Sequence, residues 1–364
     1  GSMFPLYDED GRPIDLEYAN MRERWEPVDE VTQYKGDSEA HPKLSPNDQF
    51  ADFETYEHLI VVGEDVPKEH TPDKGDYART ALMRGLEMEN SIGKNPFKFG
   101  MVGSTDSHTG FSSAEETNFL GKYALDSIPE NKTKETVPGA VGWDAAAEGL
   151  AGVWATENTR AAITAAFNRK EVYATTGTRM RVRLFAGWDF EADEVVRPDF
   201  AKQGYLRGVP MGGNLSNGPS GQSPKFMVRA LRDPDGANLD RIQIIKGWLD
   251  SKGETHEKIY DVAVTDGRKI DKDGRCKDPV GSTVDIEKAT YTNTIGEAVL
   301  TAYWEDPDFD AKQEAFYYVR VLEIPTPRWT TYDAAYYGVK RPDRVPATTQ
   351  DRAYTSPVWY SPGE

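Results

Sequence analysis

The feature that most constrains the fold is a change of pattern near residue 180. Beyond it, apolar and polar residues alternate in the segments 181–185, 225–231, 241–245, 259–264, 298–304 and 316–322. Turn-forming sequences such as 233–236 and 306–307 separate these segments. Alternation with a period of two gives a strand one buried and one exposed face. The pattern predicts a β-sandwich domain over residues 181–364, with an extended C-terminal tail that wraps the surface and a final strand at 358–360.

Residues 1–180 mix helical and strand patterns instead. We predict helices after Asp15 and over 45–60, 76–90 and 159–169, strands over 28–34, 97–102 and 172–175, and a long loop with small helices over 111–155. Strands that alternate with helices are typical of an α/β barrel or sheet, whose functional residues follow the carboxyl ends of the strands. The sequence therefore predicts two domains, residues 1–180 and 181–364.

A short carboxylate–imidazole motif follows the predicted strand over 97–102. Asp106 and His108 lie two residues apart in a loop of small residues between Gly103 and Gly110. In extended backbone these two side chains point the same way, so they can converge on one divalent metal ion. The same spacing also fits an aspartate that caps a turn beside an ordinary hydrogen-bonded loop histidine.

A second carboxylate–imidazole pair lies in the loop that follows the first predicted strand. Glu39 and His41 have the same spacing, and Pro42 favours an extended conformation at His41. Lys35 in this loop, and Arg179 near a later strand end, are candidates for binding the anionic part of a substrate. We predict Glu39, His41, Asp106 and His108 as metal ligands, and Asp106, His108, Lys35 and Arg179 as catalytic residues.

The remaining histidines and the single cysteine lack such a setting. We predict that His58, His70 and His256 lie on the solvated surface. Cys276 has no second cysteine with which to form an internal disulfide. It also lacks a paired histidine, so a nucleophilic role has no support.

The charge of the chain excludes some classes of partner. The net charge of −18 disfavours binding to nucleic acid or to anionic membrane surfaces. No apolar run approaches the roughly 20 residues of a membrane helix, so we expect no membrane span. The substrate we expect is a small, anionic molecule.

Long blocks of the sequence resemble a known family. They cover residues 30–42, 44–54, 95–110, 169–177, 233–245, 321–331 and 353–359. Over these blocks the chain resembles the family catalogued as domain of unknown function 3604, which is related to the polymerase-and-histidinol-phosphatase (PHP) hydrolases. The resemblance implies a distorted (β/α)7 barrel with a two- or three-metal site, followed by a β-sandwich. It places Asp106 and His108, and also Glu39 and His41, among the metal ligands.

One element of the PHP pattern is missing from the chain. PHP proteins open with a His-x-His element on their first strand, and no His-x-His occurs here. We expect either an upstream segment that carries further histidines, a separate complementing chain, or a degenerate barrel without activity. Relatives of this kind are often exported, which implies a periplasmic or secreted location, although this chain carries no signal peptide.

Two functional hypotheses follow. In the first, the chain is part of a metal-dependent hydrolase of the PHP type that cleaves a small ester or phosphoester with a metal-activated water. Manganese, zinc and iron all suit such ligands. In the second, the chain is a non-catalytic binding or assembly module built on a β-sandwich and a degenerate barrel. Self-association is expected in either case, because a truncated barrel exposes strand edges.

Overall fold

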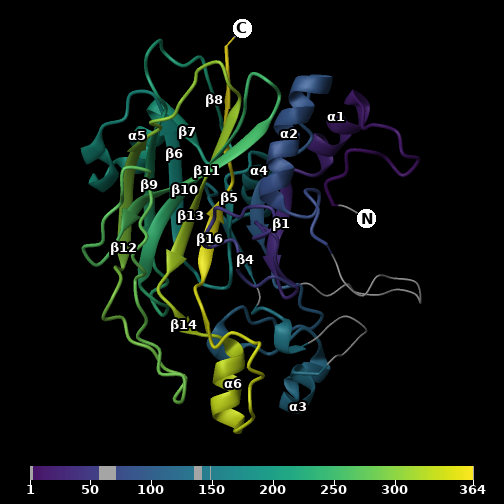
Figure 1. Ribbon diagram of the computed structural model, residues 1–364, viewed down its shortest axis with the longest axis vertical. Coiled ribbons are helices and arrows are strands. Elements are labelled where there is room, and N and C mark those ends of the chain that lie inside the picture. Colours follow the sequence, from purple (N-terminus) through teal and green to yellow (C-terminus); the bar gives the residue numbers. More distant parts are fainter. Residues whose placement is uncertain (1–2, 57–70, 135–141, 148, 364) are drawn as a thin grey trace.

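The computed structural model describes residues 3–56, 71–134, 142–147 and 149–363, which form layered sheets and helices (Figure 1). A large sheet forms the central layer. A second sheet covers one of its faces, and a long helix with a small N-terminal sheet covers the other. One hydrophobic cluster on each face of the large sheet holds the layers together.

The large sheet takes strands from both halves of the chain. Along its main path the order is β11 (Thr255–Val264), β10 (Leu239–Leu249), β13 (Ala315–Glu323), β16 (Arg352–Thr355), β5 (Val172–Thr175) and β4 (Leu150–Val153). Neighbours on this path are antiparallel. β17 (Val358–Ser361) also pairs with β13, and it pairs in parallel with β8 (Asn214–Ser216). The sheet therefore continues across residue 180, where the sequence predicts a domain boundary.

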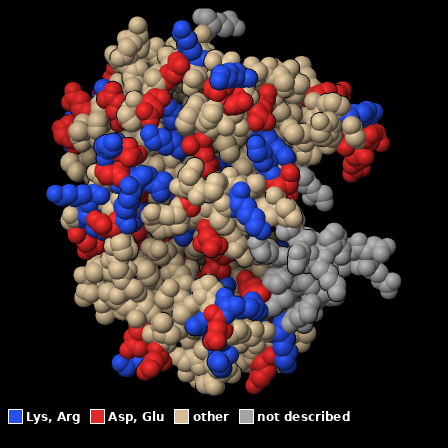
Figure 2. Space-filling model, viewed as in Figure 1, with Lys and Arg blue, Asp and Glu red and all other residues tan. Residues whose placement is uncertain are grey.

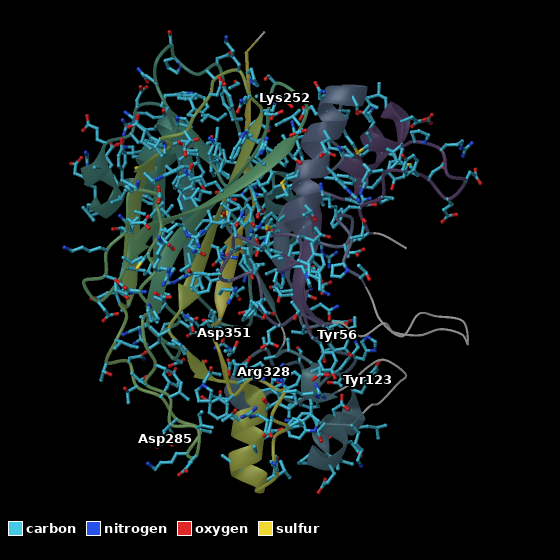
Figure 3. All side chains as sticks on the ribbon, viewed as in Figure 1. Tyr56, Tyr123, Lys252, Asp285, Arg328 and Asp351 are labelled. Carbon is cyan, nitrogen blue, oxygen red and sulfur yellow. The ribbon has the colours of Figure 1, made fainter. Side chains whose placement is uncertain are left out.

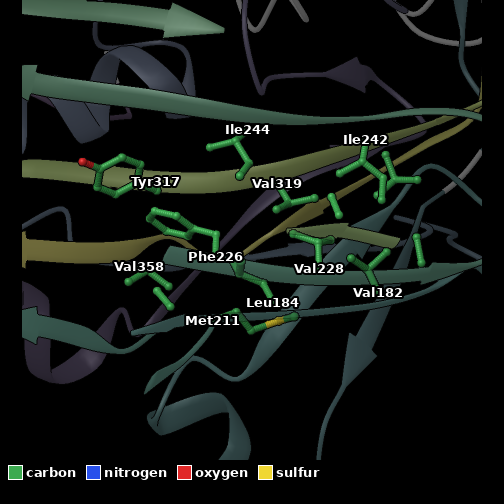
Figure 4. Close-up of a cluster of buried hydrophobic side chains, with 14 of the residues drawn as sticks. Val182, Leu184, Met211, Phe226, Val228, Ile242, Ile244, Tyr317, Val319 and Val358 are labelled. Atoms are coloured by element: carbon green, nitrogen blue, oxygen red, sulfur yellow. The ribbon is translucent and has the colours of Figure 1, made fainter. Parts of the chain in front are cut away.

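The second sheet consists of the alternating strands of the second half. Its order is β12 (Val299–Glu305), β9 (Lys225–Leu231), β6 (Arg181–Gly187) and β7 (Gly208–Pro210). Val182 and Val228 of this sheet meet Ile242 and Val319 of the large sheet in one buried cluster (Figure 4). Every segment predicted as a strand from its alternation beyond residue 180 is confirmed as a strand. Helix α5 (Phe200–Arg207) and the 3-10 turn η4 (Ala192–Val196) pack outside this sheet.

The N-terminal layer contains the helices and strands that the sequence predicts most clearly. Its helices are α1 (Leu16–Trp25), capped by Asp15, and α2 (Ala78–Ile92), which ends at Gly93 with φ of 74°. Its small sheet has the order β2 (Gly36–Asp37), β1 (Val28–Gln33) and β3 (Gly100–Gly103), with β1 and β3 parallel. α2 packs its apolar face on the large sheet.

The predicted barrel is not formed by the described residues. β1 and β3 are parallel, as a barrel requires, but β2 pairs antiparallel with β1. β4 and β5 are antiparallel and join the large sheet, where β16 takes the other edge of β5. The expectation of a (β/α)7 barrel is therefore not confirmed in the described residues, which form a mixed α/β arrangement rich in sheet. Helix α4 (Arg160–Asn168) confirms the helix predicted over 159–169.

A separate group of short elements, which we call the cap, lies at one end of the sheets (Figure 1). It comprises the described residues 111–134, 142–147 and 326–349. Its elements are η1 (Glu116–Asn118), η2 (Ala124–Ser127), α3 (Pro129–Lys132), η3 (Gly142–Asp144), β14 (Thr326–Pro327), α6 (Trp329–Tyr337) and β15 (Thr348–Thr349). Trp329 is fully buried at its centre and donates its indole N–H to the Ala145 carbonyl at 2.8 Å. In the described residues 111–134, 142–147 and 149–155, the predicted loop with small helices is confirmed except for strand β4.

Two other predictions fail. The predicted surface tail is wrong for its final strands, because β16 and β17 are buried in the large sheet and Tyr354 and Trp359 belong to its core, although residues 335–340 are exposed. The helix predicted over 45–60 is absent from its described part, residues 45–56, which forms turns. Asp48 in this segment is buried and pairs with Arg79 and Arg320.

The surface carries charges of both signs. Acidic and basic side chains are interspersed over the face shown in Figure 2. Among the described residues, no helix has the length and apolar character needed to cross a membrane.

Because β3 lies close to the large sheet at Gly103, we predict that Gly103→Ala destabilises the protein. A Cβ atom at Gly103 would lie 2.7 Å from the carbonyl oxygen of Thr175 and 2.8 Å from that of Leu150. These backbone atoms have little room to move, so we expect the free energy of unfolding to fall by about 1–3 kcal/mol in urea denaturation. Gly110→Ala is the matched control, because a Cβ there meets no atom within 4 Å. Equal stability of the two variants would contradict this packing.

Candidate functional site

The loop after β3 carries Asp106 and His108, and the parallel pairing of β1 with β3 brings Lys35 beside them. Thr32 of β1 lies opposite Gly103 of β3, so the segments that follow the two strands leave the sheet at one edge. Nζ of Lys35 donates a hydrogen bond to Oδ2 of Asp106. Two of the predicted site residues, far apart in sequence, are thus in direct contact with each other.

A second lysine reaches the same carboxylate from the cap. Nζ of Lys122 also donates to Oδ2 of Asp106, while Oδ1 of Asp106 lies 3.4 Å from Nε2 of His108. The backbone N–H of His108 donates to the carbonyl of Lys122 at 2.8 Å, and the Tyr123 ring stands edge-on to the imidazole at 5.0 Å. We call Lys35, Asp106, His108 and Lys122 the loop cluster.

The backbone of Asp106 has an unusual conformation. Its φ of 49° lies in the left-handed region, which few residues other than glycine adopt, although aspartate tolerates it better than most. Backbone strain of this kind is concentrated at functional sites. The conformation singles out Asp106 within its loop.

The loop cluster carries an excess of positive charge. Burial opposes ionisation of Asp106, but the hydrogen bonds from Lys122 and Lys35 outweigh it and hold the pKa of Asp106 below its usual value. Burial lowers the pKa of Lys122, and the neighbouring Lys35 adds to this effect against the attraction of Asp106. The side chain of Lys122 is only 6% exposed, whereas that of His108 is 51% exposed. A small anion can therefore approach the cluster from the His108 side.

Glu39 lies in a different environment, inside a buried ion cluster. Its Oε1 accepts hydrogen bonds from Arg79 and from the Tyr318 hydroxyl, and its Oε2 lies 3.3 Å from Nη1 of Arg320. Asp48 bridges the same two arginines, at 2.8 Å from Nη2 of Arg79 and 2.7 Å from Nη2 of Arg320. Burial opposes ionisation of Asp48, but the two guanidinium groups outweigh it and hold its pKa far below the usual value. We call Glu39, Asp48, Arg79 and Arg320 the buried ion cluster.

His41 is buried, and it follows Glu39 of the buried ion cluster by two residues in the sequence. Its Nδ1 accepts a hydrogen bond from the backbone N–H of Lys43 at 3.1 Å, and its ring packs against Tyr77 at 5.2 Å. Both predicted ligands of this loop, Glu39 and His41, are thus interior side chains.

The structure does not bring the four predicted metal ligands together as one group. Among the described residues, the one set of three or more potential ligands with ligand atoms within 4.8 Å of one another is Asp250, Glu254 and His256. Both Glu39 oxygens face guanidinium and phenol donors, so Glu39 does not fit a metal. Oδ1 of Asp106 and Nε2 of His108 remain as a mixed oxygen and nitrogen pair that fits one divalent ion.

Arg179 does not join the loop cluster. Its guanidinium pairs with Glu115 at 2.7 Å, and its backbone N–H donates to Asp233 at 2.7 Å. It lines a cavity whose other charged groups are carboxylates. The predicted role of Arg179 beside Lys35 has no support in this geometry.

Sequence reasoning missed Lys122 and Tyr123. Both lie in an irregular stretch of the cap, where neither periodicity nor motif spacing marks them. His256 is half-exposed, with Nε2 at 2.9 Å from Oδ2 of Asp250. It lies in the β10–β11 hairpin, and Lys252 of that hairpin is at the opposite end of the molecule from Tyr123 (Figure 3). The predictions for His58 and His70 fall outside the described residues.

Fold and site together define a mixed α/β protein of stacked sheets, with a lysine-rich carboxylate–imidazole cluster where two parallel strands end. The family described as "protein of unknown function (DUF3604)" matches residues 1–362, and the chain belongs to this family. No curated protein matches the chain.

Breaking the buried ion cluster should destabilise the protein strongly. Asp48→Asn leaves Arg79 and Arg320 with one shared carboxylate fewer in the interior, and we expect the free energy of unfolding to fall by about 3–5 kcal/mol. The control is Asp285→Asn, which removes an exposed pair with Lys288 and should cost less than about 1 kcal/mol. Denaturant unfolding of both variants measures the difference, and similar losses would contradict the assigned pairing.

The raised pKa of Asp37, which precedes Glu39 by two residues, leads us to predict that stability depends on pH. Burial, reinforced by the charge of Glu39, raises the pKa of Asp37 to about 7. Between about pH 4 and pH 7 the folded protein therefore keeps a proton that the unfolded chain releases, so stability falls as the pH rises through this window. Asp37→Asn removes this loss, and we expect it to stabilise the protein on the order of 2 kcal/mol at pH 8 and much less at pH 4.5. The exposed control Asp343→Asn should leave the pH profile unchanged.

Proposed function

We propose that the chain is a hydrolase of small anionic esters, phosphoesters among them, with its reacting centre at the loop cluster. The observation that carries the proposal is the convergence of Lys35 and Lys122 on one oxygen of Asp106, whose other oxygen faces His108. A carboxylate, an imidazole and two ammonium groups in one loop supply both the donors and the positive charge that such a reaction needs.

Lys35 and Lys122 bind the anionic part of the substrate. Their two positive charges exceed the single negative charge of Asp106, within a protein of net charge −18. A local positive site on an acidic protein attracts a small anion specifically to that place. The ammonium groups also counter the negative charge that develops on the substrate oxygens during hydrolysis.

Asp106 and His108 would hold a divalent metal ion that activates the attacking water. Oδ1 of Asp106 and Nε2 of His108 would bind a divalent ion of the manganese, zinc or iron type, and the lysines contact the other oxygen of the carboxylate. Such an ion supplies a water molecule that ionises near neutral pH. This is the chemistry of the PHP hydrolases that the sequence resembles, with Glu39 and His41 outside the reacting centre.

Three substrates and three variants test the proposal. Wild-type protein with Mn²⁺ or Zn²⁺ should hydrolyse p-nitrophenyl phosphate or bis-p-nitrophenyl phosphate in preference to the uncharged p-nitrophenyl acetate, and a chelator should abolish the activity. His108→Ala should lower kcat/KM about 100-fold or more and weaken metal binding in calorimetry. Lys35→Ala should mainly raise KM for the anionic substrates.

The matched control is His256→Ala, because His256 is also half-exposed and lies far from the loop cluster. It should leave turnover unchanged. Turnover that survives His108→Ala would place the reaction elsewhere. Absence of turnover in the wild type, together with metal binding that His108→Ala does not weaken, would favour the non-catalytic binding module.

A further inference from the structure

The cavity that Arg179 lines lies where the large sheet meets the cap; the Arg179 side chain is mostly exposed and pairs with Glu115. This cavity has a volume of about 210 Å³, and we call it the acidic cavity. The carboxylates that line it include Glu116 from η1, Glu323 from the end of β13, Asp233, and Asp351 just before β16. Figure 3 shows Asp351 at this junction, above Arg328 of the cap.

The buried carboxyl groups of the acidic cavity accept their hydrogen bonds from neutral groups. Glu323 is 2% exposed and accepts a hydrogen bond from the Thr178 hydroxyl at 2.7 Å. Asp351 is 9% exposed and accepts one from the Thr176 hydroxyl at 2.7 Å. Glu116 accepts a backbone N–H, that of Trp329. The donors seen here are hydroxyl and amide groups, which do not neutralise the charges.

Arg328, an arginine of the cap, pairs with a carboxylate outside the cavity lining. Arg328 pairs with Glu54 through two hydrogen bonds, at 2.8 Å and 2.7 Å. Burial raises the pKa of Glu323 and of Glu116 well above the usual value, and the charge of Asp351 adds to both shifts. Burial also raises the pKa of Asp351 to about 6. The cavity therefore holds several carboxyl groups whose ionised forms are disfavoured by burial and only partly compensated by the charges of Arg328 and Arg352, so a cation bound in the cavity would favour their ionised forms.

A separate observation points to a ligand in this cavity. Thr326 lines it and is 6% exposed, and its Oγ1 has no hydrogen-bond partner in the described structure. A buried hydroxyl without a partner costs about 1–3 kcal/mol, so this group calls for an explanation, and a bound molecule is one. A molecule with N–H donors inside the cavity would satisfy both this hydroxyl and the carboxylates.

We propose that the acidic cavity binds a small organic cation that carries primary ammonium groups. Tyr291 and Tyr332 also line the cavity and offer aromatic rings to such a cation. A volume of this size holds about seven water molecules, or an aliphatic amine of a few carbons. The inference does not depend on hydrolysis at the loop cluster.

An organic cation fits the cavity better than a metal ion does. Direct coordination of Ca²⁺ or Mg²⁺ needs several oxygens in one tight shell. The only described group of three acidic or histidine ligands within 4.8 Å of one another lies in the β10–β11 hairpin, away from this cavity. Carboxylates that are spread around a cavity instead match an elongated molecule with separate N–H donors.

Calorimetry and thermal unfolding with 1,4-diaminobutane, near neutral pH, test the proposal. The wild type should bind the diamine and be stabilised by it, while the uncharged 1,4-butanediol should have no effect. Glu323→Gln and Asp351→Asn should each weaken binding about tenfold or more, because hydrogen bonds to charged groups are lost. They should not lower the Tm of the free protein, because each removes a carboxyl group whose ionisation burial disfavours.

Thr326→Val separates ligand binding from folding. It keeps the shape of the side chain and removes only a hydroxyl that has no partner in the chain, so the Tm should not fall while the diamine binds more weakly. The control Glu287→Gln removes an exposed charge outside the cavity and should change neither quantity. Failure of the wild type to bind the diamine, equal binding by all variants, or saturable binding of Ca²⁺ or Mg²⁺ in its place would overturn the proposal.

Discussion

The arrangement of the N-terminal layer depends on the buried ion cluster. Charges in a protein interior are costly unless each is paired, so Arg79 of α2 and Arg320 of β13 must both find carboxylates. Glu39 and Asp48 meet this need by each contacting both arginines. The segment between them is thereby fixed between α2 and the large sheet. β2 and the turn that carries Lys35 directly precede this segment, so the position of the loop cluster also rests on these ion pairs.

Much of the secondary structure could be predicted from the sequence, because it depends on local patterns. The alternating strands beyond residue 180, and helices α1 and α2, follow from periodicity and capping. Pairing of distant segments has no such local signal. The barrel prediction is not confirmed, because β5 pairs with the distant strand β16. The tail prediction is wrong for its last strands, because Tyr354 and Trp359 are core residues despite their polar neighbours.

The site could be predicted only in part, for a similar reason. Asp106 and His108 were found because the chemistry of their motif is visible in a few residues, and Lys35 because it follows a strand end. Whether a carboxylate faces a metal or an arginine depends on segments far away in sequence. No local pattern predicts that Glu39 pairs with Arg79 and Arg320. Lys122 comes from an irregular loop of the cap and carries no sequence signal at all.

The place of β16 in the large sheet has a consequence for how the molecule is made. Ala174 of β5 pairs with Tyr354 of β16, and Val321 of β13 pairs with Ala353 on the other side. During synthesis, β5 emerges from the ribosome long before β16, the strand that separates it from β13 in the sheet. Until β16 is made, β5 lacks its partner on that edge, and closure of so large a sequence gap is slow. The nascent polypeptide therefore carries an unpaired strand edge, which favours aggregation, until β16 is translated.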